Sequence, residues 1–441
     1  MIENVPKKGI YALSSRLTFA LFGFVYVLLS ARVLQKEEYG LLMISLTIFW
    51  FASLFSDIGI GNALIKYAAE KEGEEFRKVI TNSFFLKIVM SLITSSIIVI
   101  ISPFLANLLR IPDLVSLLQF LPVLIIVSSI NNYFKQVLQS KYEVKKIFYI
   151  DSVSLISIIL LISCFYYAKI LDTAMNVLIV ISLSYGIAGF VGFYFSRDLL
   201  KFENRLDKAW ISKLSHFGKY SVTAGFGSML YMRIDTLMLS YFISPTTVAI
   251  YNAAWVISNI TNIILSAVHM IAFPAASKAN SLKDRKKLKE IYERSVAYSL
   301  LLSIPLSLIF IIFARECLFI LYETKYLDAV IVLQILALWG LIKPFGSMSG
   351  SIFNGIGRPD MDAKLTWSTA IINIVLNIIF IPIYGVVGAA IASVIAFTII
   401  ILVDIYLMKK WINAEVTGIL RECCTIVRGH RGRNDYGKDN M

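Results

Sequence analysis

The stretch "IINIVLNIIFIPIYGVVGAAIASVIAFTIIILV" (residues 371–403) carries no Asp, Glu, Lys or Arg side chain. A transmembrane α-helix needs about 20 predominantly apolar residues to cross a hydrocarbon core of about 30 Å. This stretch is therefore long enough for two crossings. Apolar runs of similar character recur along the whole chain, and they predict a helical membrane protein. A membrane β-barrel would instead show short segments of alternating hydrophobicity.

Composition supports this fold class. The chain has 441 residues, of which 58% are hydrophobic and only 16% are charged, whereas a soluble domain usually carries about 25% charged residues. No cleavable signal peptide is expected, because the N-terminus runs directly into a full-length apolar span. We predict an all-α polytopic membrane protein with twelve transmembrane spans, at residues 10–31, 40–63, 80–106, 114–136, 147–168, 173–196, 214–242, 247–273, 294–315, 329–353, 364–383 and 386–408.

Lysine and arginine are distributed unequally between the two sides that these spans define. The N-terminus, the even-numbered connections and the C-terminal tail hold 32 of them, and the opposite connections hold six. Because cytoplasmic loops carry the excess of basic residues, we predict a multi-pass protein of the cell (cytoplasmic or inner) membrane with both termini cytoplasmic. The net charge of +13 then reflects topology and contact with anionic lipids. Nucleic-acid binding is not predicted, since the basic residues are spread over many short loops.

Two six-span halves organise the predicted chain. They are residues 1–196 and 214–408, joined by a cytoplasmic linker at 197–213 and followed by a basic cytoplasmic tail at 409–441. Since six is an even number, both halves insert with the same orientation, as parallel repeats do. A faint repeat supports this division: "LLSARVLQKEEYGLLMIS" (28–45) resembles "MLSYFISPTTVAIYNAAWVIS" (238–258). The external connections are short, so we expect function to lie between the helices.

Metal chemistry is not predicted. The four cysteines and three histidines show no metal-ligand spacing.

Four cations fall well inside predicted spans, where a charge usually faces a cavity or a partner. Lys87 is about two turns from the cytoplasmic end of its span, so it can equally snorkel to the headgroups. Arg16 can also snorkel, although small residues on its helical face favour packing or a groove. Arg233 and Lys343 lie near mid-span, which favours a cavity over a structural ion pair. Pro344 follows Lys343, so we expect a kink or break there.

A polar stripe marks the eighth span. Its residues recur at spacings of three and four, which places them on one helical face, and a cavity lining is favoured over a packing seam. They are Asn252, Trp255, Asn259, Asn262, Ser266 and His269.

Arg233 and Asp235 lie two residues apart in the seventh span and are separated by about 200° on a helix, so they cannot simply pair with each other. We expect Asp235 to anchor its helix within its lobe and Arg233 to stay free for an anion. Asp57, Asp235 and His269 are candidates for coupling to a proton or sodium gradient. No other cofactor is expected.

These features resemble the polysaccharide flippases (Wzx type) of the multidrug/oligosaccharidyl-lipid/polysaccharide exporter superfamily. The resemblance rests on the span pattern over about residues 10–410 and on motifs such as "SARVLQKEEYGLLMIS" (30–45) and "FPAAS" (273–277). The other matching motifs are residues 56–69, 233–257 and 354–394. One departure is that the related lipid II flippases carry fourteen helices, which makes lipid II a less favoured substrate.

The resemblance implies two six-helix lobes around a central cationic cavity with alternating access. It implies a transporter, not an enzyme, that flips polyprenyl-pyrophosphate-linked oligosaccharide from the cytoplasmic to the outer leaflet for surface polysaccharide biosynthesis. Its partners would be this lipid-linked substrate, membrane lipids and, where they occur, a polysaccharide polymerase and glycosyltransferases. The predicted substrate-binding residues are Arg16, Arg233, Lys343, Asn252, Asn259 and Asn262.

Two other functions fit the sequence less well. A cation-coupled drug antiporter of the same superfamily would need acids in its cavity, whereas cations dominate here. A membrane oligosaccharide polymerase or ligase would need a large external loop for its catalytic residues, and none is predicted.

Overall fold

The computed structural model describes residues 5–428, and the side chains of all of these except 5–13, 16, 218–224 and 264. Within that part of the chain every regular element is a helix. The elements are α1 (Val5–Val33), α2 (Lys36–Asp57), α3 (Ile60–Glu70), α4 (Gly73–Leu109), α5 (Leu114–Ser140), α6 (Val144–Tyr167), α7 (Ala174–Ser196), α8 (Lys208–Phe242), α9 (Pro245–Ser258), α10 (Thr261–Ser281), α11 (Arg285–Ile312), α12 (Ala314–Tyr322), η1 (Leu327–Ala329), α13 (Val330–Ala337), α14 (Trp339–Gly355), α15 (Pro359–Ile412) and α16 (Val416–Val427).

Eight helical segments of the described residues are long and apolar enough to cross a membrane, or nine if the bent pair α13–α14 forms one span. The long helix α15 contains two of the predicted spans, and Gly385 (φ 60°, ψ −135°) kinks it between them. A positive φ of this kind is accessible mainly to glycine. Helix α8 falls outside the eight, and α1 contributes only the shorter apolar segment Leu17–Val33. The number twelve therefore stays a prediction.

The chain divides into two compact units. Unit 1 comprises Met1–Val256 and Leu321–Tyr326, and unit 2 comprises Ile257–Ile320 and Leu327–Met441. Helices α8 and α9 thus pack with the N-terminal helices. The six-and-six repeat division, with its linker at 197–213, stays a prediction.

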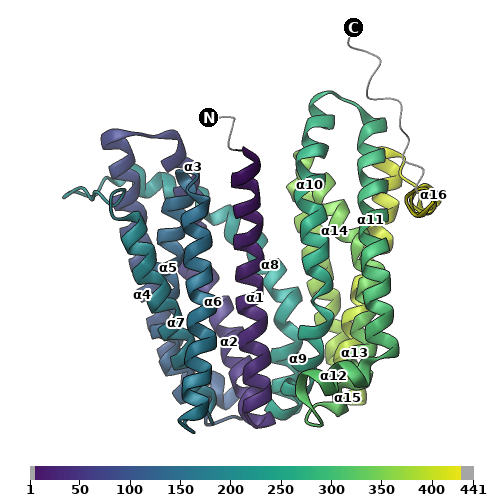
Figure 1. Cartoon of the computed structure of the whole chain (residues 1–441), viewed down its shortest axis with the longest axis horizontal. Coiled ribbons are helices and arrows are strands. Elements are labelled where there is room, and N and C mark those ends of the chain that lie inside the picture. The colour runs from purple at the N-terminus through teal and green to yellow at the C-terminus, as the bar shows by residue number, and fades with distance from the viewer. Residues whose placement is uncertain (1–4, 429–441) are drawn as a thin grey trace. The chain divides into compact units, whose positions relative to one another are not determined.

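Unit 1 is built on neighbouring helix pairs. Helix α1 packs along α6, and α5 packs against both α4 and α7 (Figure 1). Helix α2 ends at Asp57, because Ile58 and Gly59 both adopt left-handed backbone conformations before α3 begins. This break positions the Asp57 side chain at a helix end.

A short segment, Leu321–Tyr326, belongs to unit 1 although the chain on both sides of it belongs to unit 2. The Lys325 ammonium donates to the backbone carbonyls of Ala31 (3.0 Å) and Leu34, at the C-terminal end of α1. Burial lowers the pKa of Lys325. The Tyr326 ring packs edge-on against Tyr39, with 5.9 Å between centroids.

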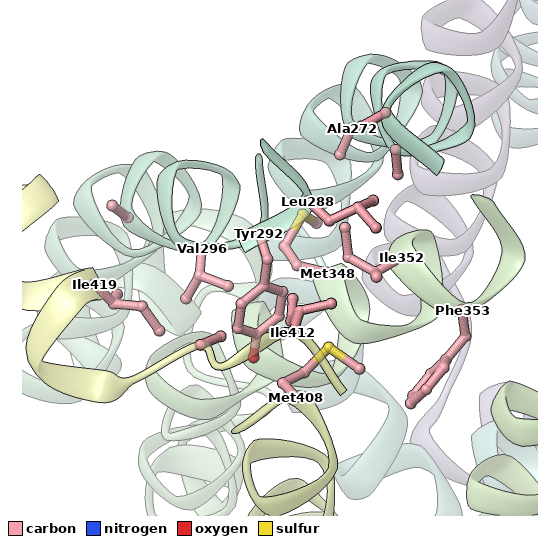
Figure 2. Packing of buried hydrophobic residues seen from close by; sticks show 14 of the residues in the cluster. Ala272, Leu288, Tyr292, Val296, Met348, Ile352, Phe353, Met408, Ile412 and Ile419 are labelled. Atoms are coloured by element: carbon pink, nitrogen blue, oxygen red, sulfur yellow. The ribbon is translucent and has the colours of Figure 1, made fainter. Parts of the chain in front are cut away.

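Unit 2 has an apolar core formed by α10, α11, α14, α15 and α16 (Figure 2). Helix α16 contributes Ile419, which is 2% exposed. The backbone N–H of Glu415, just before α16, donates to Glu293 Oε1 of α11 at 3.0 Å. Part of the predicted C-terminal tail is therefore a packed helix.

Candidate functional site

Arg233 of α8 lies between two tryptophan rings. Its guanidinium carbon is 3.8 Å from the centroid of Trp50 on α2 and 4.3 Å from the centroid of Trp255 on α9. A guanidinium over an aromatic face is attracted by the ring quadrupole, and the attraction grows when water is excluded. The two indoles therefore hold Arg233 in a fixed orientation while its side chain stays only half-buried.

No carboxylate neutralises this arginine within the described part of the chain. The groups that interact with its charge are the hydroxyls of Tyr26, Tyr39 and Tyr251. All of these lie in unit 1, on α1, α2 and α9. Guanidinium presents five N–H donors in a planar fork that matches phosphate oxygens. Arg233 is thus a cation among aromatic side chains, and its N–H donors are not taken up by a carboxylate of the described residues.

Asp235 faces a different direction from Arg233 and has a different partner. It is 2% exposed, and its Oδ2 accepts a 2.5 Å hydrogen bond from the Tyr251 hydroxyl. At the next residue of each helix, Asn252 Nδ2 donates to Thr236 Oγ1 at 3.2 Å. These contacts join α8 to α9. Asn252, at 1% exposure, belongs to this seam.

The Arg16 side chain lies outside the described residues. Beside it in sequence, Ser15 donates to the buried carboxyl of Asp151 on α6, and Lys135 of α5 pairs with the same carboxyl at 3.1 Å. The sequence analysis overlooked this cluster. The signal was available, since Asp151 lies inside the predicted span 147–168.

Lys87 does not snorkel, so that alternative was wrong. It is 3% exposed, and its ammonium is 2.6 Å from Asp57 Oδ1 and 2.7 Å from Gln136 Oε1. The break after α2 brings Asp57 to α4, where a buried ion pair satisfies both charges better than a long reach to the headgroups. A sequence pattern on one helix cannot reveal such a partner.

Lys343 lies in unit 2 and is 6% exposed. Its ammonium donates to Asn262 Oδ1 at 2.9 Å and lies 4.6 Å from the Trp339 ring centroid. No carboxylate pairs with it in the described residues. The expected break occurs, with a 42° bend, but at Leu338 and not at Pro344, which α14 accommodates within its second turn.

The polar stripe was predicted to lie along one continuous helix. It does not, because α9 ends at Ser258 and α10 begins at Thr261. Asn262 Nδ2 donates to Asn259 Oδ1 across this break, so Asn259, Asn262 and Lys343 form one polar chain in unit 2. Ser266 is exposed. The His269 ring stacks on Phe273 at 6.4 Å and 11°.

Metal binding finds no support in the described residues, where no group of three or more His, Cys, Asp or Glu side chains is placed to hold an ion.

Comparison with known sequences points to one family. A family model described as "Polysaccharide biosynthesis protein" matches residues 29–331. The chain is 27% identical to an uncharacterized membrane protein of Methanocaldococcus jannaschii, covering 95% of this chain and 88% of that protein. It is 22% identical to the lipopolysaccharide biosynthesis protein WzxC of Escherichia coli, covering 86% and 73%. It is 25% identical to the probable low-salt glycan biosynthesis flippase Agl15 of Haloferax volcanii, covering 48% and 45%.

Comparison with solved structures confirms the all-helical polytopic fold. The TM-score is 0.73 to an inward-facing multidrug resistance MATE family transporter of the MOP superfamily, at 18% identity and with 94% and 96% of the two chains covered. It is also 0.73 to the lipid II flippase MurJ in an inward closed conformation, at 16% identity and with 97% and 93% covered. At these identities the likeness concerns the fold alone.

Proposed function

Because this chain belongs to the polysaccharide biosynthesis protein family, whose Wzx-like members are transporters of the MOP superfamily and not enzymes, we propose that it is a flippase for lipid-linked glycans. The specific substrate in this proposal is a polyprenyl-pyrophosphate-linked oligosaccharide. The protein moves its headgroup from the cytoplasmic to the outer leaflet by alternating access through a cationic cavity, while the polyprenyl tail stays in lipid.

The observation that carries the proposal is the Arg233 site. A pyrophosphate cannot cross hydrocarbon bare, because an uncompensated charge there is very costly. Arg233 offers a charge without a carboxylate partner, oriented by Trp50 and Trp255. Guanidinium binds phosphate oxygens in bidentate fashion. An arginine that is already paired to a carboxylate would gain much less from an arriving phosphate.

The polar chain of unit 2 carries groups that suit the same class of ligand. Lys343 is held by Asn262 and not by an acid, so its charge also remains available to an anion. Asn262 and Asn259 carry amides that both donate and accept, which suits sugar hydroxyls. We therefore keep Lys343, Asn259 and Asn262 as substrate-binding residues alongside Arg233, and we keep Arg16 on the sequence argument alone.

Two predicted roles change in this proposal. Asn252 and Asp235 take part in the seam between α8 and α9, so we assign them to packing and not to substrate or ion binding. Asp57 is engaged by Lys87, and His269 stacks on Phe273. Neither arrangement favours a role in ion coupling.

The remaining parts of the proposal concern location and partners. We infer a cell membrane location with both termini cytoplasmic, from the distribution of basic residues. Membrane lipids surround the protein, and a polymerase and glycosyltransferases act before or after it. A cation-exporting antiporter is disfavoured, because an uncompensated arginine would repel its substrate.

Transport in proteoliposomes tests the proposal. The probe is a fluorescent undecaprenyl-pyrophosphate disaccharide, and a membrane-impermeant reductant reports how much of it has moved between leaflets. Arg233→Ala should reduce flipping to the rate of empty liposomes, and Arg233→Lys should restore part of it.

A matched control is Lys213→Ala. Lys213 also lies over aromatic rings, 4.6 Å from the Trp210 centroid, but it is exposed, so its loss should leave flipping unchanged. Wild-type flipping by Arg233→Ala would refute the assignment of Arg233.

A further inference from the structure

Asp404 is a buried acid that neither the sequence analysis nor the proposed function uses. It lies in the second half of α15 and is 4% exposed. The helix ends eight residues later at Ile412, so the carboxyl is about 12 Å along the helix axis from that end. Lys409 and Lys410 are exposed near the end, which is where basic residues meet lipid headgroups. Asp404 is thus inside the apolar layer.

The Asp404 carboxyl lacks the partners that a buried carboxylate needs. Its Oδ1 has no hydrogen-bond partner, and no Lys, Arg or His of the described residues forms an ion pair with it. Another buried acid of a helix interior, Asp151, is held by Lys135 at 3.1 Å and by Ser15. Asp404 has no counterpart of the Lys135 ammonium among the described residues.

The helices around Asp404 supply acids and hydroxyls. Helix α15 packs against α11, α13 and α14. From α11, the Tyr292 hydroxyl is close enough to interact with Asp404. Ser349 of α14 interacts with both groups, and Asp362 at the start of α15 adds a second acid.

Two of the other charged groups on the packed helices have partners of their own. Helix α13 carries no titratable side chain. The Lys343 ammonium of α14 is bound by Asn262, and Glu293 of α11 accepts from the backbone of Glu415. Burial and the neighbouring Asp362 carboxyl therefore disfavour a negative charge on Asp404, and the Ser349 hydroxyl offsets them only in part.

Close packing encloses this carboxyl. A Cβ atom at Gly346 of α14 would lie 3.3 Å from Asp404 Oδ2, so α14 and α15 approach each other closely at this level. Met408, one turn after Asp404, belongs to the apolar core that also contains the Tyr292 ring (Figure 2).

An ionised carboxylate in such a place costs far more free energy than the neutral acid, because burial without a compensating charge or donor penalises the charged form. We propose that Asp404, with Tyr292 and Ser349, is a proton-binding site of unit 2. The carboxylic acid keeps its proton while α14 is packed against α15, and it releases the proton to water when these helices separate. Protonation then favours the packed arrangement, by the reciprocity that links binding to conformation.

Infrared spectroscopy of the full-length protein in lipid tests the protonation itself. The wild type at neutral pH should show the C=O stretching band of a carboxylic acid, and Asp404→Asn should lose it. Asp151→Asn, the matched control, should instead lose intensity from the carboxylate band. The proposal is overturned if Asp404→Asn loses carboxylate intensity and leaves the acid band unchanged.

A second variant covers a failure of Asp404→Asn to fold. Tyr292→Phe removes one hydroxyl and keeps the ring in the apolar core, so the fold should tolerate it. The acid band should shift in frequency, because the dipole beside the carboxyl is gone. An unshifted band would contradict the site as built from these two residues.

That the proton is exchanged during transport rests on the proposed function. With the fluorescent undecaprenyl-pyrophosphate disaccharide, an imposed pH gradient should change wild-type flipping several-fold and leave Asp404→Asn flipping unchanged. A gradient response in Asp404→Asn equal to the wild type would refute the coupling. No flipping by the wild type would refute the proposed function instead, while the infrared result would still stand.

Discussion

Replacing Lys87 by Met tests whether the cation on α4 is a structural partner and not a lipid-facing residue. The Lys87 ammonium is 2.6 Å from Asp57 Oδ1 and 2.7 Å from Gln136 Oε1, and the Lys87 residue is 3% exposed. Removing one partner of a buried ion pair costs about 3–5 kcal/mol when the other charge stays fully buried. The Asp57 side chain is 30% exposed and keeps some hydration, so we expect the lower end, about 3 kcal/mol.

The double variant Asp57→Asn/Lys87→Met removes both charges at once. Because replacing a whole buried pair is often close to neutral, it should cost less than about 1 kcal/mol. The coupling energy between the two sites is then about 2 kcal/mol or more, within the range for contacting residues. The assay is equilibrium unfolding in mixed detergent micelles, followed by tryptophan fluorescence.

Lys78 provides a control on the same helix. It pairs with Glu74 at 2.8 Å near the start of α4, where water and salt screen the charges. Lys78→Met should change the free energy of unfolding much less than Lys87→Met does. Equal effects of the two single variants, or additive effects in the double variant, would refute the buried-pair interpretation.

Three further outcomes are expected. Tyr251→Phe removes the 2.5 Å donor to Asp235 and should lower the free energy of unfolding in the same assay by about 1–3 kcal/mol, the cost of an unsatisfied buried acceptor; no loss would argue against the α8–α9 seam. Gly385→Ala forces a side chain into φ 60°, ψ −135° and should cost about 1–3 kcal/mol, whereas unchanged stability would contradict the kink. In a variant without native cysteines, Ser266→Cys should react with a water-soluble maleimide and Asn252→Cys should not. The reason is that Ser266 is exposed and Asn252 is 1% exposed. The reverse order of reactivity would contradict the orientation of the polar stripe.

The membrane fold was accessible from the sequence because hydrophobicity is a property of each segment by itself. A run such as residues 371–403 has to be helical in lipid, where every backbone group needs an internal partner. The predicted span 40–63 runs through the break after Asp57, where Ile58 and Gly59 adopt left-handed backbone conformations. The separation of Arg233 from Asp235 followed from helix geometry alone.

Partner choice was not accessible in the same way. Depth along one helix suggested that Lys87 could reach the headgroups, but its partners Asp57 and Gln136 come from two other helices. The polar stripe on the eighth span was predicted for an unbroken helix. The break between Ser258 and Thr261 changes the directions in which its asparagine side chains point. The Lys343 region does bend, at Leu338 and not at its proline.

The sequence by itself determined the helical membrane class, the family resemblance and the presence of cations at mid-span, because these depend on composition and local order. Only the tertiary structure decided which charges are neutralised. It gave Lys87 and Asp151 opposite charges as partners, left Arg233 among aromatic rings and left Asp404 without a cation. The physical reason is that the cost of a buried charge depends on atoms within a few ångströms, and those atoms come from helices far apart in the chain.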